Sequence, residues 1–118
     1  MFQSILATLV ARTRARWAMI VGNDGVLLET DNHGFRAEAE GLAAEYASFY
    51  RSSRKTAGDT DLGALINSQL VTEQGKVLFQ PLTSEYFLVL ALDPDSHAGK
   101  AFFEISRACG SLEEELVF

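Results

Sequence analysis

The segment FRAEAEGLAAEYASFYR, residues 35–51, has two different faces when it is built as a helix. At about 100° per residue, its apolar side chains fall on one broad stripe: Phe35, Ala39, Leu42, Ala43, Tyr46, Phe49 and Tyr50. The opposite face carries small residues: Ala37, Gly41, Ala44 and Ser48. The apolar stripe predicts a side that packs on a core. The small residues permit close approach of another backbone, which suggests assembly.

The residues before this helix predict another helix and a hairpin. Apolar residues in 2–10 repeat at i, i+3, i+4, i+7 and i+8, which is typical of a helix with one buried stripe. Short apolar runs at 17–21 and 26–30 are separated by Gly-Asn-Asp-Gly, residues 22–25. Because these residues tolerate the positive φ angles of a tight turn, we predict a β-hairpin.

Two polar features flank these elements. Asp31 or Asn32 is available to cap the central helix. Arg12, Arg14 and Arg16 lie near the end of the first helix, where cations complement the helix dipole. A dipole-matched helix end and a basic contact for an acidic partner both account for these arginines.

Three strands follow the central helix. The polar residues 52–61 are interpreted as the helix end and a loop. Strands are then predicted at 66–72, with one face wet, and at 76–82, where Pro81 marks the end or an edge position. The continuous apolar run 86–92 predicts the most buried strand of the sheet.

A final helix is predicted after the polar residues 93–96, which offer caps. Its apolar stripe is Ala98, Phe102, Ile105, Cys109, Leu112 and Leu116. Gly110-Ser111 is expected to interrupt it. The order α-β-β-α-β-β-β-α predicts an α+β fold, with a mostly antiparallel five-stranded sheet against helices, in a single domain spanning residues 1–118.

Charge and composition exclude several classes of function. The net charge is -6, and residues 59–118 carry three basic and ten acidic groups. Such a surface repels phosphate backbones and anionic membranes, so we expect no nucleic-acid partner and no membrane insertion.

No apolar run approaches the roughly 18 residues that span a bilayer. Cys109 is the single cysteine and has no partner for an internal disulfide. We therefore expect a cytoplasmic protein.

Motifs for enzymes, cofactors and metals are missing from the sequence. It contains no GxxxxGK[ST], GxGxxG or GxSxG motif and no zinc-type cluster of Cys and His. Asp93, Asp95 and Glu104 match positions 1, 3 and 12 of a calcium loop, but Ala98 stands where position 6 requires glycine. We therefore predict no active site, no cofactor and no metal.

Several segments carry a family resemblance: Met19-Ile20-Val21, Asp24-Gly25, residues 40–44, and above all QLVTEQGKVLFQPL, residues 69–82, leading into Phe87-Leu88-Val89-Leu90. In this order, they resemble the roadblock/dynein light chain domain family over almost the whole chain, from Phe2 to about Leu116. One departure is Arg16-Trp17-Ala18, where family members often have a Gly-Ala pair opening the first strand.

The resemblance implies a roadblock-like, profilin-like architecture and a homodimer. Family members join their central helices antiparallel across a two-fold axis and pair their third strands edge to edge. On this chain the implied interface comprises Ala37, Gly41, Ala44, Ser48, Ile66, Ser68, Leu70 and Thr72.

The resemblance also implies a partner. Family members mostly bind Ras-like small GTPases, so a non-enzymatic regulator or scaffold that modulates GTP hydrolysis or localisation is expected. The candidate partner-binding residues are Arg16, Arg36, Glu40 and Arg51. Of these, Arg16 and Arg36 are candidates to supply an arginine to the transition-state charge.

Two other functions fit the sequence. One is a small-ligand sensor of the PAS-like or profilin-like type, with a pocket between sheet and helices lined by Phe79, Tyr86, Phe87 and Phe102. Core packing also accounts for these aromatic residues. The other is a structural adaptor that binds its partner regardless of nucleotide state.

Overall fold

The computed structural model describes residues 2–31 and 36–116, and within this range nothing is described of the side chains of Arg36 and Ala37. The elements are α1 (Phe2–Thr13), β1 (Trp17–Gly22), β2 (Leu27–Asp31), α2 (Arg36–Asp59), β3 (Ser68–Val71), β4 (Lys76–Pro81), β5 (Tyr86–Leu92) and α3 (Ala98–Glu115). The predicted order of helices and strands is confirmed. Phe35 and the predicted cap Asn32 lie outside the described residues.

The five strands form one sheet in the order β2-β1-β5-β4-β3, and all four pairings are antiparallel. β5 lies in the middle, and every residue after Tyr86 in this strand is buried. The continuous apolar run therefore does mark the most buried strand. β2 and β3 are the two edges of the described sheet.

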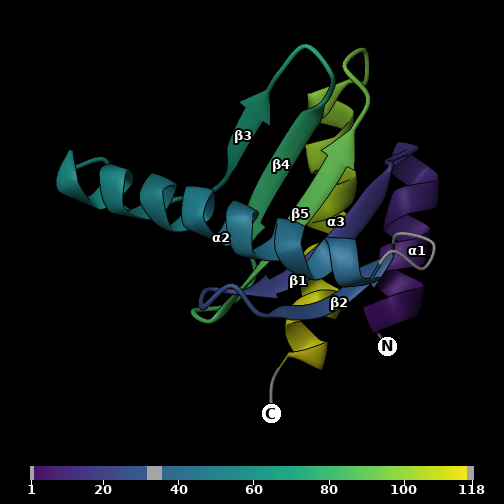
Figure 1. Cartoon of the computed structure of the whole chain (residues 1–118), viewed down its shortest axis with the longest axis horizontal. Coiled ribbons are helices and arrows are strands. Elements are labelled where there is room, and N and C mark those ends of the chain that lie inside the picture. The colour runs from purple at the N-terminus through teal and green to yellow at the C-terminus, as the bar shows by residue number, and fades with distance from the viewer. Residues whose placement is uncertain (1, 32–35, 117–118) are drawn as a thin grey trace.

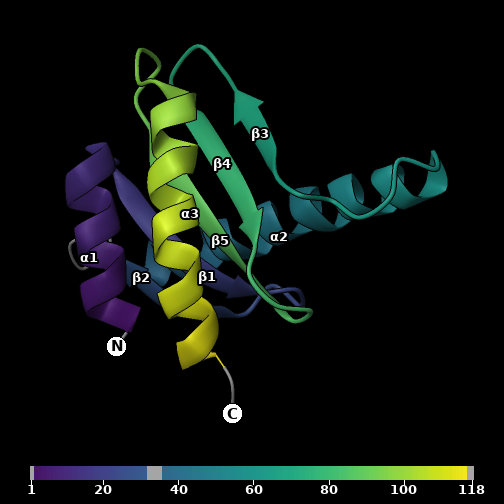
Figure 2. The same cartoon turned by 180° about the vertical axis from the view of Figure 1, so that it is seen from behind.

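The helices divide between the two faces of the sheet. α2 crosses one face, and α1 and α3 lie side by side on the other (Figures 1 and 2). Each face has its own apolar cluster. Leu6, Leu88 and Ile105 belong to the α1/α3 side, whereas Met19 and Val89 belong to the α2 side. The alternation of side chains along the buried strands separates the two clusters.

Aromatic rings fill the space between α2 and the sheet. Tyr50 of α2 stacks on Phe87 of β5 with ring centroids 4.0 Å apart, and Phe49 meets Phe79 at 4.9 Å. Most of the predicted apolar stripe thus packs on the core. Leu42 is the exception, because it is 38% exposed at the margin of the stripe while Ala47 is fully buried.

α2 is longer than predicted, because it continues to Asp59 instead of ending near Arg51. Its C-terminal turns extend past β3 with no strand beneath them (Figure 1). A helix without a packing face has no need of an apolar stripe, so the polar composition of this part was wrongly interpreted as a loop. An ion pair between Lys55 and Asp59, four residues apart, supports the last turns.

α3 also differs from its prediction at two points. The cap is His97, whose Nδ1 accepts a hydrogen bond from the Lys100 N–H at 3.2 Å, and not a residue of 93–96. Gly110-Ser111 does not interrupt the helix. Both residues are exposed, and a glycine on an exposed face costs the helix only about 1 kcal/mol relative to alanine. Among the described residues, no helix combines the length and apolarity needed to cross a bilayer.

Candidate functional site: the β3 edge and the outer face of α2

The edge formed by β3 is open. β3 pairs with β4 on one side, and no described strand lies on its other side. The strand runs from Ser68 to Val71, so it begins later than the predicted residue 66. Within it, the Ser68 Oγ is buried and has no hydrogen-bond partner among the described residues. An open strand edge is a template for pairing with another chain.

Large apolar side chains are exposed in β3 and in the segment that leads into it from α2. Leu62 is 81% exposed, Ile66 is 77% exposed and Val71 is 60% exposed. They are half of the large hydrophobic residues exposed in the described chain, and all belong to β3 or to the segment leading into it. Of these residues, Val71 lies in the open strand and Ile66 lies two residues before it, so exposed apolar side chains accompany the open edge.

Ile66 is one of the predicted interface residues, whereas the exposure of Leu62 and Val71 was not predicted. Leu62 stands alone in a polar segment, where periodicity gives no signal. Val71 lies on the face of β3 that Gln69 shares, and this face was interpreted as wet from its polar members.

The small residues of α2 lie on the exposed face of the helix, opposite its apolar stripe, as predicted. Gly41, Ala44 and Ser48 are exposed on the described helix. A Cβ added at Gly41 would meet no atom within 4 Å, so packing within this chain does not require glycine there. The side chain of Ala37 lies outside the description.

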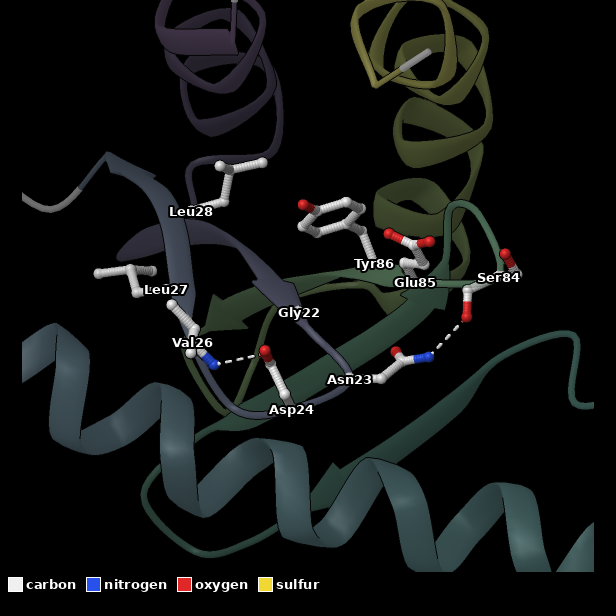
Figure 3. Close-up of a pocket in the computed structure, with 9 residues that line it drawn as sticks. All are labelled: Gly22, Asn23, Asp24, Val26, Leu27, Leu28, Ser84, Glu85 and Tyr86. Atoms are coloured by element: carbon white, nitrogen blue, oxygen red, sulfur yellow. Dashed lines mark hydrogen bonds between the residues drawn. The ribbon is translucent and has the colours of Figure 1, made fainter. Parts of the chain in front are cut away.

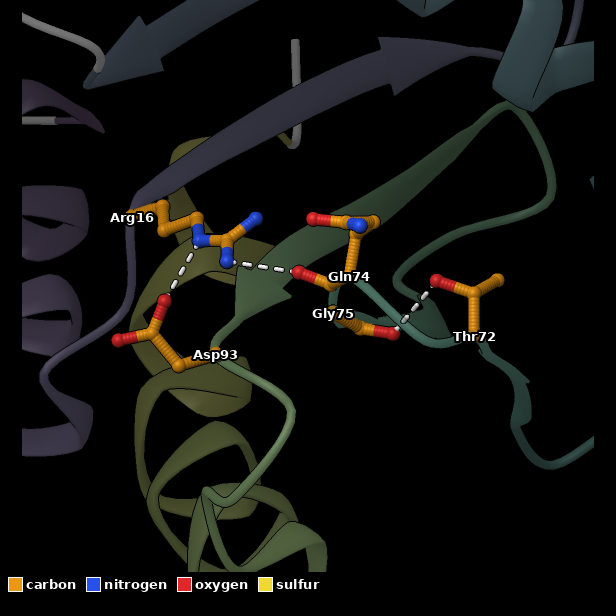
Figure 4. Close-up of polar contacts among 5 residues, drawn as sticks. All are labelled: Arg16, Thr72, Gln74, Gly75 and Asp93. Carbon is orange, nitrogen blue, oxygen red and sulfur yellow. Dashed lines mark hydrogen bonds and ion pairs between the residues drawn. The ribbon is translucent and has the colours of Figure 1, made fainter.

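The two remaining interface candidates have contacts of their own. Leu70 is partly buried against the apolar cluster on the α2 side. Thr72 lies just beyond β3, and its N–H and hydroxyl donate hydrogen bonds to the Gly75 carbonyl at 2.9 and 3.0 Å (Figure 4). Thr72 therefore closes the β3–β4 turn.

Arg16 connects three segments at one end of the sheet: the start of β1, the β3–β4 turn and the end of β5. Its Nε donates to Asp93 Oδ1 and its Nη2 donates to the Gln74 carbonyl, both at 2.7 Å (Figure 4). A Cβ at Gly75 would lie 2.8 Å from the Leu92 carbonyl oxygen and 3.2 Å from Arg16 Nη1. The turn at Gly75 and the guanidinium of Arg16 thus fit tightly against each other.

The other partner-binding candidates lie at the opposite end of β1. Arg51 Nη1 donates to the Asn23 carbonyl at 2.6 Å, beside the β1–β2 turn. Glu40 lines a shallow hollow with Gly25, Val26 and Leu27 of the same turn. The structure therefore brings Arg51 and Glu40 to the same hairpin and separates both from Arg16. The side chain of Arg36 is not described.

The aromatic residues proposed for a sensor pocket do not share one. Phe79 and Phe87 are fully buried in the cluster on the α2 side. Tyr86 and Phe102 pack against the cluster on the α1/α3 side. Because the sheet separates the two pairs, they act as core residues of opposite faces.

The titratable groups with shifted pKa values are buried or partly buried. Burial, with the nearby Glu113 carboxylate, raises the pKa of the Cys109 thiol to about 11. Burial also raises the pKa of Tyr46 and of Tyr50. A thiol with this pKa stays protonated at neutral pH and is a poor nucleophile. Within the described ranges, no three His, Cys, Asp or Glu residues are grouped to hold a metal ion.

Solved structures with the same architecture cover nearly the whole chain. MglB of Myxococcus xanthus matches with a TM-score of 0.86 at 16% identity, over 95% of this chain and 91% of that one. A Roadblock/LC7 domain of Streptomyces avermitilis matches with a TM-score of 0.88 at 18% identity, over 98% of both chains. MglC of M. xanthus is 25% identical, with a TM-score of 0.70 over 98% of both chains. No curated protein sequence matches.

The sequence itself matches the model of one family, described as the Roadblock/LC7 domain, over residues 1–91. This match includes β1 to β4, α1, α2 and nearly all of β5. The chain belongs to the Roadblock/LC7 domain family.

Proposed function

We propose that this protein is a non-enzymatic homodimer that binds a Ras-like small GTPase in the cytoplasm and modulates its GTP hydrolysis or localisation. The observation that carries the proposal is the combination of family membership with an open, apolar-rimmed β3 edge. Structurally similar proteins of M. xanthus include MglB and MglC, and one related structure is described as MglB with a tetrameric arrangement.

The dimer is proposed to form across a two-fold axis between β3 strands and between α2 helices. Pairing of two β3 edges satisfies the backbone groups that β4 leaves open, and it covers Ile66 and Val71. The part of α2 that extends past β3 then lies over the partner's sheet. Gly41, Ala44 and Ser48 permit close approach of the two helices, with Ala37 as the fourth small residue.

The GTPase is proposed to meet the α2 side of the dimer near the β1–β2 turn. Arg51 and Glu40 lie there, and Arg36 begins the same helix. Arg51 is the better candidate to supply an arginine to the transition-state charge, because it would release one hydrogen bond, to the Asn23 carbonyl, whereas Arg16 would release two. Arg16 would first have to release Asp93 and Gln74, so any contact that it makes with a partner would break these two hydrogen bonds.

The test is to measure GTP turnover by the cognate GTPase with and without the purified protein. A rate change that disappears in Arg51→Ala supports catalysis by this residue. Binding without a rate change, equal in GDP and in a GTP analogue, supports the adaptor. Absence of both binding and rate change contradicts the proposal.

A further inference from the structure

A hollow of about 380 Å³ lies at the end of the sheet where two turns meet. The β1–β2 turn contributes Asn23, Asp24 and Val26, and the β4–β5 turn contributes Ser84 and Glu85 (Figure 3). Its volume is in the range of small-ligand sites. The dimer proposal does not use this hollow, and the GTPase proposal uses the α2 side of the same β1–β2 turn.

The two turns are joined rigidly by Asn23. Its backbone N–H donates to the Glu85 carbonyl at 2.8 Å, and its Nδ2 donates to the Ser84 carbonyl at 2.7 Å. Its own carbonyl accepts from Arg51 Nη1 at 2.6 Å. The position of the side-chain amide is therefore fixed, and rotating it would set Oδ1 against the Ser84 carbonyl.

The remaining polar atom of Asn23 has no partner. Its Oδ1 is buried and accepts no hydrogen bond among the described residues. In Figure 3 this oxygen lies on the side of the residue that faces Glu85 and Tyr86. A buried acceptor without a donor is unfavourable, and a donor that reaches it from outside the chain would remove that cost.

The charge and the walls of the hollow specify the donor. The lining includes the carboxylates of Asp24 and Glu85 and no Lys or Arg. Val26, 64% exposed, Leu28 and the ring of Tyr86 give it apolar walls. A cation with an apolar stem fits this combination. Guanidinium fits best, because its planar fork donates to two acceptors at once and stacks on aromatic rings.

We propose that this hollow, named here the Asn23 pocket, binds an arginine side chain of a partner protein. The guanidinium donates to Asn23 Oδ1 and pairs with Glu85, and its methylene stem lies against Val26 and Tyr86. The partner's backbone has a place beside the pocket, because β2 is an edge strand of the described sheet. The net charge of -6 favours approach of such a basic segment.

The experiment titrates the full chain, labelled with 15N, with the capped peptide acetyl-Ala-Arg-Ala-amide and follows the backbone amide signals by NMR. Saturable shifts of the Gly22, Asn23 and Tyr86 signals are expected, with a dissociation constant of about 1–10 mM for a single side chain. The citrulline peptide, which lacks the charge, should bind at least about tenfold more weakly.

Variants then locate the contact. Glu85→Gln keeps the shape of an exposed side chain and should weaken binding of the arginine peptide several-fold. Glu73→Gln, an exposed acid of the turn at the other end of the sheet, is the matched control and should leave binding unchanged. Unfolding midpoints of both variants should equal that of the wild-type protein.

Three results overturn the proposal: no saturable shift near Asn23, equal binding of the arginine and citrulline peptides, or equal losses in Glu85→Gln and Glu73→Gln. Free L-arginine tests the other source of a guanidinium. Its carboxylate is repelled by Asp24 and Glu85, so tighter binding of free arginine than of the capped peptide would instead identify a metabolite site. These readouts need no GTPase, so they fail or succeed separately from the proposed function.

Discussion

At the scale of single residues, two arginines at the end of α1 have specific structural tasks. Arg16 donates to Asp93 and Gln74, as described above. Arg14 has a positive φ of 57°, and the following Ala15 N–H donates to the Val10 carbonyl at 3.1 Å. This is the geometry of a Schellman helix end, in which glycine is the usual residue. The sequence predicted that these arginines lie near a helix end, where their charge is favourable. The spacing of residues along the chain could not predict which groups each arginine contacts.

Replacing Arg14 with glycine should stabilise the protein. A left-handed conformation costs a residue with a Cβ roughly 1–2 kcal/mol, and glycine loses part of this gain through its greater freedom in the unfolded chain. The expected rise in the free energy of unfolding is about 0.5–1 kcal/mol, measured by urea denaturation. Arg12→Gly, within the helix, is the control and should be destabilising by about 1 kcal/mol. A destabilised Arg14→Gly would contradict the strain argument.

Cys109 should make stability depend on alkaline pH. Its pKa rises from 9.0 to about 11 in the folded chain. The folded state therefore holds the proton more tightly, and its stabilisation is complete below pH 9 and is lost as the pH rises from 9 through about 11. Tyr46 and Tyr50, with pKa values also raised by burial, act in the same direction.

Unfolding free energies of the wild-type protein and Cys109→Ala between pH 8 and 11 provide the measurement. The wild-type curve should fall more steeply across this window than the variant curve. Parallel curves would show that the thiol has the same pKa folded and unfolded.

At the scale of elements, the positions of the strands were predictable and two helix ends were not. Apolar runs bounded by Gly and Asp located β1 and β5 within a residue. α2 continues beyond the edge of the sheet, so its last turns have no packing face and carry no apolar stripe from which a helix could be predicted. The alternation in residues 66–72 indicated a strand but did not show that β3 is an edge, because edge position follows from the pairing of all five strands.

Gly41→Leu tests the outer face of α2. Within one chain the added side chain has open space, and the helix gains about 1 kcal/mol of propensity. Folding should therefore be unharmed while dimerisation weakens by at least about tenfold, as measured by sedimentation equilibrium. Gly110→Leu is the matched control, since Gly110 also lies in a helix with open space around it. A fully dimeric Gly41→Leu protein refutes the packing of α2 on its symmetry mate.

Val71→Lys tests the β3 edge. A lysine on an edge strand opposes pairing with a second edge, so the variant should be largely monomeric at concentrations where the wild-type protein is dimeric. Val26→Lys places the same charge at another exposed valine, next to β2, and should stay dimeric. Size-exclusion chromatography with light scattering distinguishes the two, and equal masses for both variants would exclude β3 from the interface.

At the scale of the whole molecule, net charge and apolar surface act in opposite directions on assembly. Each chain carries -6, so two chains repel each other, whereas the side chains around β3 favour association. Salt screens the repulsion and leaves the apolar term in place. The dimer should therefore tighten by about threefold between roughly 20 and 300 mM NaCl. A dimer that weakens with salt would show that attractive ion pairs dominate the interface.

The pairing of β1 with β5 also governs the order in which the chain can fold during synthesis. Trp17 pairs with Ala91, so β1 obtains its second neighbour only after most of the chain has left the ribosome. Until then the hairpin of β1 and β2 has one unpaired edge, and Met19, Ile20 and Val21 lack the β5 residues of the clusters that bury them. β4 waits for β5 in the same way, since every central pairing involves this last strand. The nascent chain therefore exposes aggregation-prone strands until residue 92 emerges, which makes early capture by a chaperone advantageous.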